Sequence, residues 1–161
     1  MEIIQLEKSS QTSLSIMIFD EGTILKPKSW FSLYHHKSYI PIGNCVEIIK
    51  GWQEQGANIL YVTSRKGRQA QDIAALLKKY GFTGTELYYR GAGEKYKDII
   101  EKAQPDVLIE DDCKSIGGTW QMCITNVAPY IKEKIVSIVV EEFKGIDSLP
   151  RDISALTQAK R

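Results

Sequence analysis

The sequence has few cysteines, no long hydrophobic run and no excess of charge of either sign. The three cysteines, Cys45, Cys113 and Cys123, lack the spacing of a metal site, and their odd number favours a reducing compartment. The apolar run at residues 14–19 is far too short to span a bilayer, and nothing at the N-terminus resembles a signal peptide. Lysine and arginine total 21 against 20 acidic residues, so no overall field indicates nucleic acid or a membrane surface. We therefore expect a cytoplasmic protein.

The length and composition are those of an ordinary globular protein. The chain has 161 residues, of which 43% are hydrophobic and 25% are charged, and it contains no internal repeat. We predict a single domain over residues 1–161, with a core at about residues 13–143. Both ends, the first dozen residues and the tail after Pro150, are expected to be flexible, and residues 155–161 offer few apolar anchors.

Strand and helix signals alternate along the chain. Short apolar runs predict strands at residues 14–19, 57–62, 85–89 and 106–109. Helical spacing and end signals predict helices at residues 44–55, 68–80 and 94–103. This alternation predicts an α/β fold in three layers, with a Rossmann-like, mostly parallel sheet. Beyond Asp112 the pattern is weaker, and we predict a strand at 122–127 and a helix over 129–143.

Polar side chains follow three of the predicted strands. In a parallel sheet, ligands bind at the carboxyl ends of the strands, where such residues gather. The groups predicted at this edge are carboxylates, hydroxyls and an ammonium from Asp20, Glu21, Thr23, Thr63, Ser64, Glu110, Asp111, Asp112 and Lys95. Hard oxygen ligands suit Mg²⁺, and hydroxyl and lysine donors suit phosphate oxygens. The sequence thus predicts a site for Mg²⁺ and phosphate.

Four segments in this order resemble the motifs of the haloacid-dehalogenase-like (HAD) superfamily. Residues 16–24 resemble the first motif, an apolar strand followed by Asp-x-Asp-Gly-Thr, and residues 59–65 resemble the second. Lys95 is similar to the lysine of the third motif, and residues 107–112 resemble the acidic fourth motif. The resemblance covers about residues 13–112 and is nearest to small nucleotidase-like members. It implies a HAD-like core and Mg²⁺-dependent hydrolysis of a phosphomonoester through an aspartyl-phosphate.

The resemblance also implies a role for each matching residue. Catalysis would involve Asp20 as the nucleophile and Glu21 as the acid or base. The phosphate would be bound by Gly22, Thr23, Thr63, Ser64 and Lys95. Mg²⁺ would be held by Asp20, Glu110 and Asp111. Lys97 remains an alternative to Lys95, and Asp112 an alternative to Asp111.

The first motif is one residue shorter than the family pattern, which leaves two alignments. If Phe-Asp is matched, Asp20 is the nucleophile and the second acid is out of register. If Gly-Thr is matched, Glu21 takes the acid/base position and Phe19 replaces the nucleophile. The first alignment is favoured, because the apolar run ends at Asp20 and puts its carboxylate at the strand tip. The second predicts a catalytically degenerate domain that binds phosphate or a nucleotide.

The resemblance implies two places for an inserted cap domain, after the first motif and between the second and third, and both are short here. Residues 24–42 and 81–93 are too short to bury a core of their own. We therefore predict a capless, solvent-open pocket with residues 30–39 and the loop after Asp112 at its rim. Its ligand is expected to be a nucleotide or another phosphorylated small molecule, and a homo-oligomer is a further option.

Overall fold

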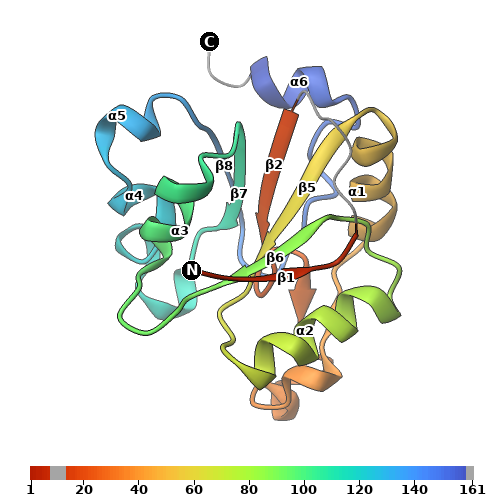
Figure 1. Ribbon diagram of the computed structural model, residues 1–161. Coiled ribbons are helices and arrows are strands. Elements are labelled where there is room, and N and C mark those ends of the chain that lie inside the picture. Colours follow the sequence, from red (N-terminus) through yellow and green to blue (C-terminus); the bar gives the residue numbers. More distant parts are fainter. Residues whose placement is uncertain (8–13, 159–161) are drawn as a thin grey trace.

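The computed structural model describes residues 1–7 and 14–158 and contains a six-stranded sheet at its centre (Figure 1). The strand order is β1-β6-β5-β2-β7-β8; β1 pairs antiparallel with β6, and the other pairings are parallel. The strands are β1 (Glu2–Gln5), β2 (Leu14–Phe19), β5 (Ala57–Val62), β6 (Glu86–Tyr89), β7 (Val107–Asp111) and β8 (Val136–Val140). The predicted Rossmann-like, mostly parallel α/β fold is thereby confirmed.

Helices cover both faces of this sheet, as the prediction of three layers requires. Figure 1 shows α1 (Cys45–Glu54) and α2 (Arg68–Lys79) on one side of the strands. On the other side lie α3 (Tyr96–Ala103), α4 (Cys123–Asn126) and α5 (Pro129–Lys132). A last helix, α6 (Ile153–Gln158), packs near the start of β2.

Helix α2 follows directly from its sequence. Its apolar residues recur at helical spacing, and Ala70, Ile73 and Leu77 are buried against the sheet. Gly81, with φ +77°, ends the helix in the left-handed conformation that glycine adopts most easily. Asn44 occupies the N-cap position of α1, but its side chain makes no capping hydrogen bond with the helix. Its backbone N–H and side-chain amide both donate to Asp147, each at 2.9 Å.

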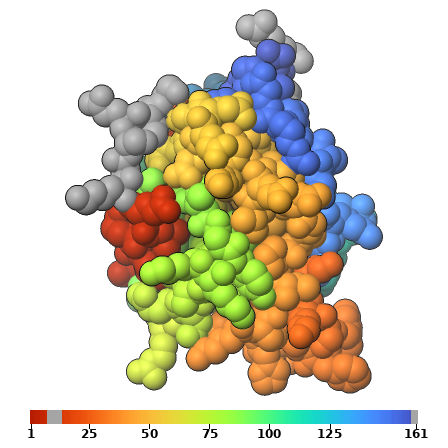
Figure 2. Space-filling model, turned by 90° about the vertical axis from the view of Figure 1, so that its right-hand side faces the viewer, coloured from red at the N-terminus to blue at the C-terminus, as the bar shows by residue number. Residues whose placement is uncertain are grey.

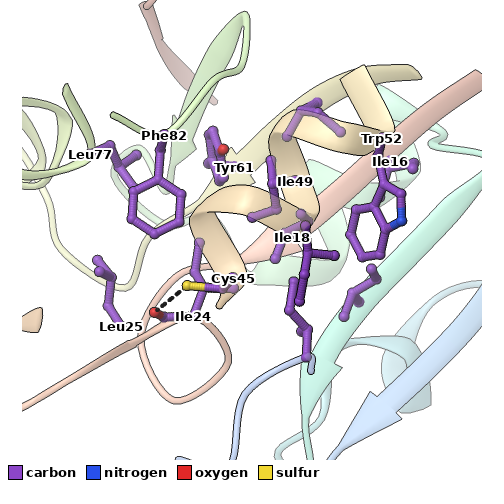
Figure 3. Packing of buried hydrophobic residues seen from close by; sticks show 14 of the residues in the cluster. Ile16, Ile18, Ile24, Leu25, Cys45, Ile49, Trp52, Tyr61, Leu77 and Phe82 are labelled. Atoms are coloured by element: carbon purple, nitrogen blue, oxygen red, sulfur yellow. Dashed lines mark hydrogen bonds between the residues drawn. The ribbon is translucent and has the colours of Figure 1, made fainter. Parts of the chain in front are cut away.

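The core has two parts, one on each face of the sheet. On the α1 side, Figure 3 shows Ile18 of β2 and Tyr61 of β5 packed with Trp52 of α1. On the α3 side, Met17 of β2 and Leu60 of β5 pack against the other helices. Successive strand residues thus alternate between the two parts, as the period of two requires. Strand β2 is buried on both faces.

Two predictions beyond Asp112 are wrong. The predicted strand at residues 122–127 is the short helix α4 instead. The predicted helix over residues 129–143 contains α5, which begins with a proline in its first turn, and then strand β8. The β-branched run of β8 explains the second error, because Val and Ile lose side-chain freedom in helices and pack well in sheets.

Both ends of the described chain are more ordered than predicted. Strand β1 adds an antiparallel edge to the sheet within the first dozen residues. Near the other end, Leu156 of α6 is 1% exposed and belongs to the core, while Trp52 Nε1 donates to the carbonyl of Pro150 at 2.9 Å. The remaining parts of the predicted flexible ends, residues 8–13 and 159–161, lie outside the described residues.

The segment between β2 and α1 forms a small lobe that contains little regular secondary structure. It holds the short pair β3 (Leu25–Lys26) and β4 (Ile40–Pro41), with two 3-10 turns between them, η1 (Trp30–Ser32) and η2 (His36–Ser38). In Figure 2 this segment, in orange, forms the lower edge of the molecule beside α2. His36 Nε2 lies 2.9 Å from Asp72 Oδ2 of α2, which fixes the lobe to that helix.

Among the described residues, no helix combines the length and the apolar character needed to cross a membrane.

Leu156 provides a test of how firmly α6 belongs to the fold. We expect Leu156→Ala to lower the free energy of unfolding by about 2–5 kcal/mol, because it removes a fully buried side chain from the core. Gln158→Ala, an exposed change in the same helix, should stay within about 0.5 kcal/mol of the unaltered protein. Chemical denaturation measures both, and equal small losses would show that α6 is not part of the cooperative core.

Candidate functional site

A cavity of about 200 Å³ lies at the carboxyl ends of β2, β5 and β7. Its wall combines several carboxylates with aromatic and sulfur-containing side chains. The lining residues are Phe19, Glu21, Gly22, Tyr39, Ser64, Tyr96, Glu110, Asp111, Cys113, Ile116, Gln121, Cys123, Glu142 and Phe143. The cavity therefore lies at the edge of the sheet where the sequence predicts a site.

The direction of side chains at the end of β2 decides which first-motif residues reach the cavity. Phe19 follows Met17 on the α3 side of the sheet, and Glu21 continues on that side. Both line the cavity, and the Phe19 ring contacts Tyr96 edge-on with centroids 5.3 Å apart. Asp20 has the parity of Ile18, which lies in the core on the α1 side. It is Phe19 that occupies the strand tip facing the cavity.

The carboxyl group of Asp20 is enclosed in the interior. The residue is 0% exposed and absent from the cavity wall, and neither carboxylate oxygen has a hydrogen-bond partner among the residues that the structure describes. Burial, with the charge of Glu21 adding to it, raises the pKa of Asp20 well above its usual value. The structure does not bring Asp20 together with the other predicted site residues.

Glu21 occupies the donors that were predicted to bind phosphate. The Thr63 hydroxyl donates to Glu21 Oε1 at 2.5 Å, and the Ser64 backbone N–H donates to Oε2 at 3.0 Å. Arg65 Nε lies 3.8 Å from Oε1 and completes an ion pair. Thr63 is fully buried, and its hydroxyl is connected to the cavity through its hydrogen bond to Glu21. The Glu21 carboxylate thus occupies the donors that an anionic ligand would otherwise use.

Gly22 and Thr23 bring the first and fourth motifs together. The Thr23 hydroxyl donates to Asp111 Oδ1 at 3.2 Å, and the Cys113 N–H donates to Asp111 Oδ2 at 3.0 Å. Gly22 has φ +87°, and a Cβ built on it would come within 2.7 Å of Asp111 Oδ1. Only glycine allows this close approach. Asp111 is buried, and burial raises its pKa.

Glu110 faces the start of α4. Its carboxylate accepts the backbone N–H of Cys123 at 2.6 Å and that of Ile124 at 2.9 Å. The residue is 2% exposed, and its burial raises the pKa to about 6 in spite of these two donors. Glu110 lines the cavity as predicted, and both of its oxygens are already used by backbone donors.

Three other carboxylates form the group best placed to hold a metal ion. Single oxygens of Asp111, Asp112 and Glu142 lie within 4.8 Å of one another. Hard carboxylate oxygens at this spacing fit Mg²⁺ or Ca²⁺. Of the predicted ligands, Asp111 and its alternative Asp112 both belong to this group. Asp20 and Glu110 do not belong to it, and no ion identity follows from the group alone.

Glu142 was missed in the sequence because it lay in a predicted helix. It follows β8, the neighbour of β7, so it stands at the carboxyl end of a parallel strand like the other acids. Its carboxylate accepts the Ser115 N–H at 2.8 Å and the Ser115 hydroxyl at 2.6 Å. Recognising the β-branched run as a strand would have placed Glu142 at the site by the same rule.

The two lysines predicted to bind phosphate lie outside this cavity. Lys95 and Lys97 instead line a neighbouring hollow together with Arg90. Tyr96, between the two lysines in sequence, lines both hollows. Lys97 is also 3.9 Å from Glu101. The predicted rim is present in part, since Tyr39 and the loop after Asp112 line the cavity but Trp30 does not.

The comparisons with known proteins give a fold and no family. No family model matches the chain, and no curated protein matches it. Among solved structures, the chain is similar to one from a structure described as "Structure of Pnkp1/Rnl/Hen1 complex", with 11% identity and a TM-score of 0.56. The similarity covers 84% of this chain and 49% of that one, so this chain spans about half its length. At this identity the likeness shows the fold alone, and HAD membership stays a prediction.

Gly22 provides a test of the close contact with Asp111. Gly22→Ala should destabilise the protein by about 1–3 kcal/mol more than Gly81→Ala. Both glycines have positive φ, +87° and +77°, but nothing lies within 4 Å of a Cβ at Gly81. The control thus measures backbone strain without the clash. Equal losses in urea denaturation would contradict the contact.

Glu110 predicts a pH dependence of stability. Because its pKa in the folded state is raised from 4.5 to about 6, the folded protein holds this proton more tightly than the unfolded chain. Its contribution to stability is therefore greatest below pH 4.5 and declines as the pH rises through about 6. Relative to Glu110→Gln, the unaltered protein should lose about 2 kcal/mol over this range. Parallel stability curves for the two proteins would refute the shift.

Proposed function

We propose that this protein binds a divalent cation and a phosphorylated small molecule without forming an aspartyl-phosphate. The observation that carries the proposal is the side-chain direction at the end of β2. Phe19 faces the cavity, and Asp20 lies buried on the opposite side of the strand. This arrangement corresponds to the second alignment of the first motif, in which an aromatic ring replaces the nucleophile. A carboxylate that is buried and does not line the cavity is not placed to attack a phosphate bound there.

The charge of the cavity supports the cation. Glu21, Glu110, Asp111 and Glu142 all line it, while no lysine or arginine does among the residues that the structure describes. Carboxylates this close repel one another, and a bound cation relieves that repulsion. Asp111, Asp112 and Glu142 would hold the ion. Mg²⁺ is a fitting candidate because it needs few protein carboxylates and binds phosphate oxygens readily.

The remaining wall supports a small organic ligand. Phe19, Tyr96 and Phe143 offer apolar surface beside the carboxylates. Such surfaces bind a ring or a sugar face, while the polar groups fix its orientation. The cation would neutralise the phosphate, because the Thr63 and Ser64 donors are engaged by Glu21.

Phosphomonoester hydrolysis is the second candidate. Asp20 lies between two cavity-lining residues, and its oxygens have no hydrogen-bond partner, which is uncommon for a buried carboxyl. A backbone rearrangement at residues 20–21 that pointed the Asp20 side chain into the cavity in place of Phe19 would supply the nucleophile of the family mechanism. The experiment described next separates this candidate from the proposed function.

The test combines metal binding with an assay of phosphate release. We expect Mg²⁺ to bind by isothermal titration calorimetry, and Asp112→Asn and Glu142→Gln to weaken binding about tenfold or more. Glu141→Gln, an exposed carboxylate next to Glu142, should leave it unchanged. A panel of phosphomonoesters should release no phosphate with Mg²⁺, and Asp20→Asn should behave like the unaltered protein.

Two outcomes would overturn the proposal. Metal-dependent phosphate release that Asp20→Asn abolishes would establish the hydrolase instead. Mg²⁺ binding that is absent, or insensitive to Asp112→Asn and Glu142→Gln, would remove the metal site.

A further inference from the structure

A second hollow adjoins the acidic cavity and has the opposite charge. It has a volume of about 500 Å³ and is lined by Arg90, Lys95, Tyr96, Lys97, Trp120, Gln121, Cys123 and Asn126. Three of these side chains are cationic, and no carboxylate lines it among residues 1–7 and 14–158. Tyr96, Gln121 and Cys123 also line the acidic cavity, so the two hollows share a wall. The two hollows are therefore neighbours.

Arg90 stacks on an aromatic ring, and no carboxylate pairs with it in residues 1–7 and 14–158. Its guanidinium lies over the Tyr96 ring, 4.1 Å from the centroid. Its Nε is buried and has no hydrogen-bond partner within that part of the chain. Arginine presents a planar set of donors that matches phosphate oxygens, and stacking on an aromatic ring fixes its orientation. The group is prepared for an anion that the protein itself does not supply.

The lysines at the start of α3 add to this charge. Lys95 is exposed, and no carboxylate is paired with its ammonium in the part of the chain that the structure describes. Lys97 has only a distant contact with Glu101, 3.9 Å away. The ammonium groups and Arg90 thus face one hollow from the same short segment of chain. Their mutual repulsion favours binding of an anion between them.

Trp120 supplies an aromatic surface at the same place. It belongs to the 3-10 turn η4 (Gly118–Trp120) and is 81% exposed. The Asn126 side chain donates to the Trp120 carbonyl at 3.3 Å and so ties this turn to α4. A large exposed ring beside cations is suited to stacking with a nucleobase.

We propose that this basic hollow binds a nucleoside phosphate, with its phosphate on Arg90, Lys95 and Lys97 and its base on the Trp120 ring. The inference goes beyond the proposed function, because the phosphate and the base of this ligand both lie in the basic hollow and do not depend on a cation in the acidic cavity. Inorganic phosphate shares the anion chemistry but lacks the base, and the experiment separates the two.

The experiment measures binding of the four common nucleoside 5′-monophosphates, the matching nucleosides and inorganic phosphate by calorimetry, with Mg²⁺ and with a chelator. We expect at least one nucleotide to bind more tightly than its nucleoside or phosphate alone. Lys95→Gln and Arg90→Gln should weaken nucleotide binding about tenfold or more. Trp120→Ala should weaken nucleotide binding to a similar degree and leave phosphate binding unchanged.

Matched controls are available elsewhere on the surface. Trp30→Ala removes a ring of nearly equal exposure, 83%, that lines neither hollow, and Lys50→Gln removes an exposed ammonium on α1. Neither should change binding. If Arg90→Gln disturbs folding by exposing Tyr96, the exposed Lys95 still decides the question.

The outcomes separate this inference from the proposed function. Nucleotide binding that persists in chelator and falls in Lys95→Gln supports the basic hollow, whatever happens at the metal site. Normal Mg²⁺ binding together with unchanged nucleotide affinity in Lys95→Gln and Arg90→Gln overturns this inference alone. Equal affinity for phosphate and nucleotide would show an anion site without a base. No binding of any nucleotide at about 1 mM would also overturn it.

Discussion

Strand β2 is packed on both faces, and this packing fixes where every side chain at its end can point. Ile16 and Ile18 lie in the core beside α1, and Met17 lies in the core beside α3. A rotation of the strand by one residue would exchange the two sets and disrupt both cores. The direction of Phe19 and Glu21 toward the cavity is therefore imposed by packing several residues away. The same packing keeps Asp20 in the interior, so the chemistry available at this edge depends on the core.

Because Asp20 does not line the cavity, the carboxylates at its wall include ones that already accept hydrogen bonds from the protein. Glu21 is bound by Thr63 and Ser64, and Glu110 by the first turn of α4. Each of these carboxylates joins two segments of the chain through its hydrogen bonds. The acids nearest to solvent, Asp112 and Glu142, are the ones that remain close enough for a cation. Attraction for phosphate then comes from that cation and from the basic hollow beside it.

The sequence was sufficient to predict an element where one periodic hydrophobic pattern dominated. It was insufficient where the packing of distant residues decides the conformation or the direction of a side chain. Helix α2 and strands β2, β5 and β7 were predicted because their apolar patterns and end signals agree. The choice between Phe19 and Asp20 was not, because a strand buried on both faces is apolar at every position and conceals its alternation. Strand β8 was lost to a helix prediction, and Glu142 with it. Leu156 was missed because a single apolar residue gives no local pattern, although its burial depends on distant partners.

Glu21 links these observations to ligand choice. Its carboxylate satisfies the Thr63 hydroxyl and the Ser64 N–H from within the chain. A phosphate from solution would have to displace this tethered group and leave a carboxylate without its donors, which costs more than an ordinary lost hydrogen bond. An anion therefore gains most where its donors are free. Those donors are the Arg90 guanidinium and the Lys95 ammonium, one wall away from the acidic cavity.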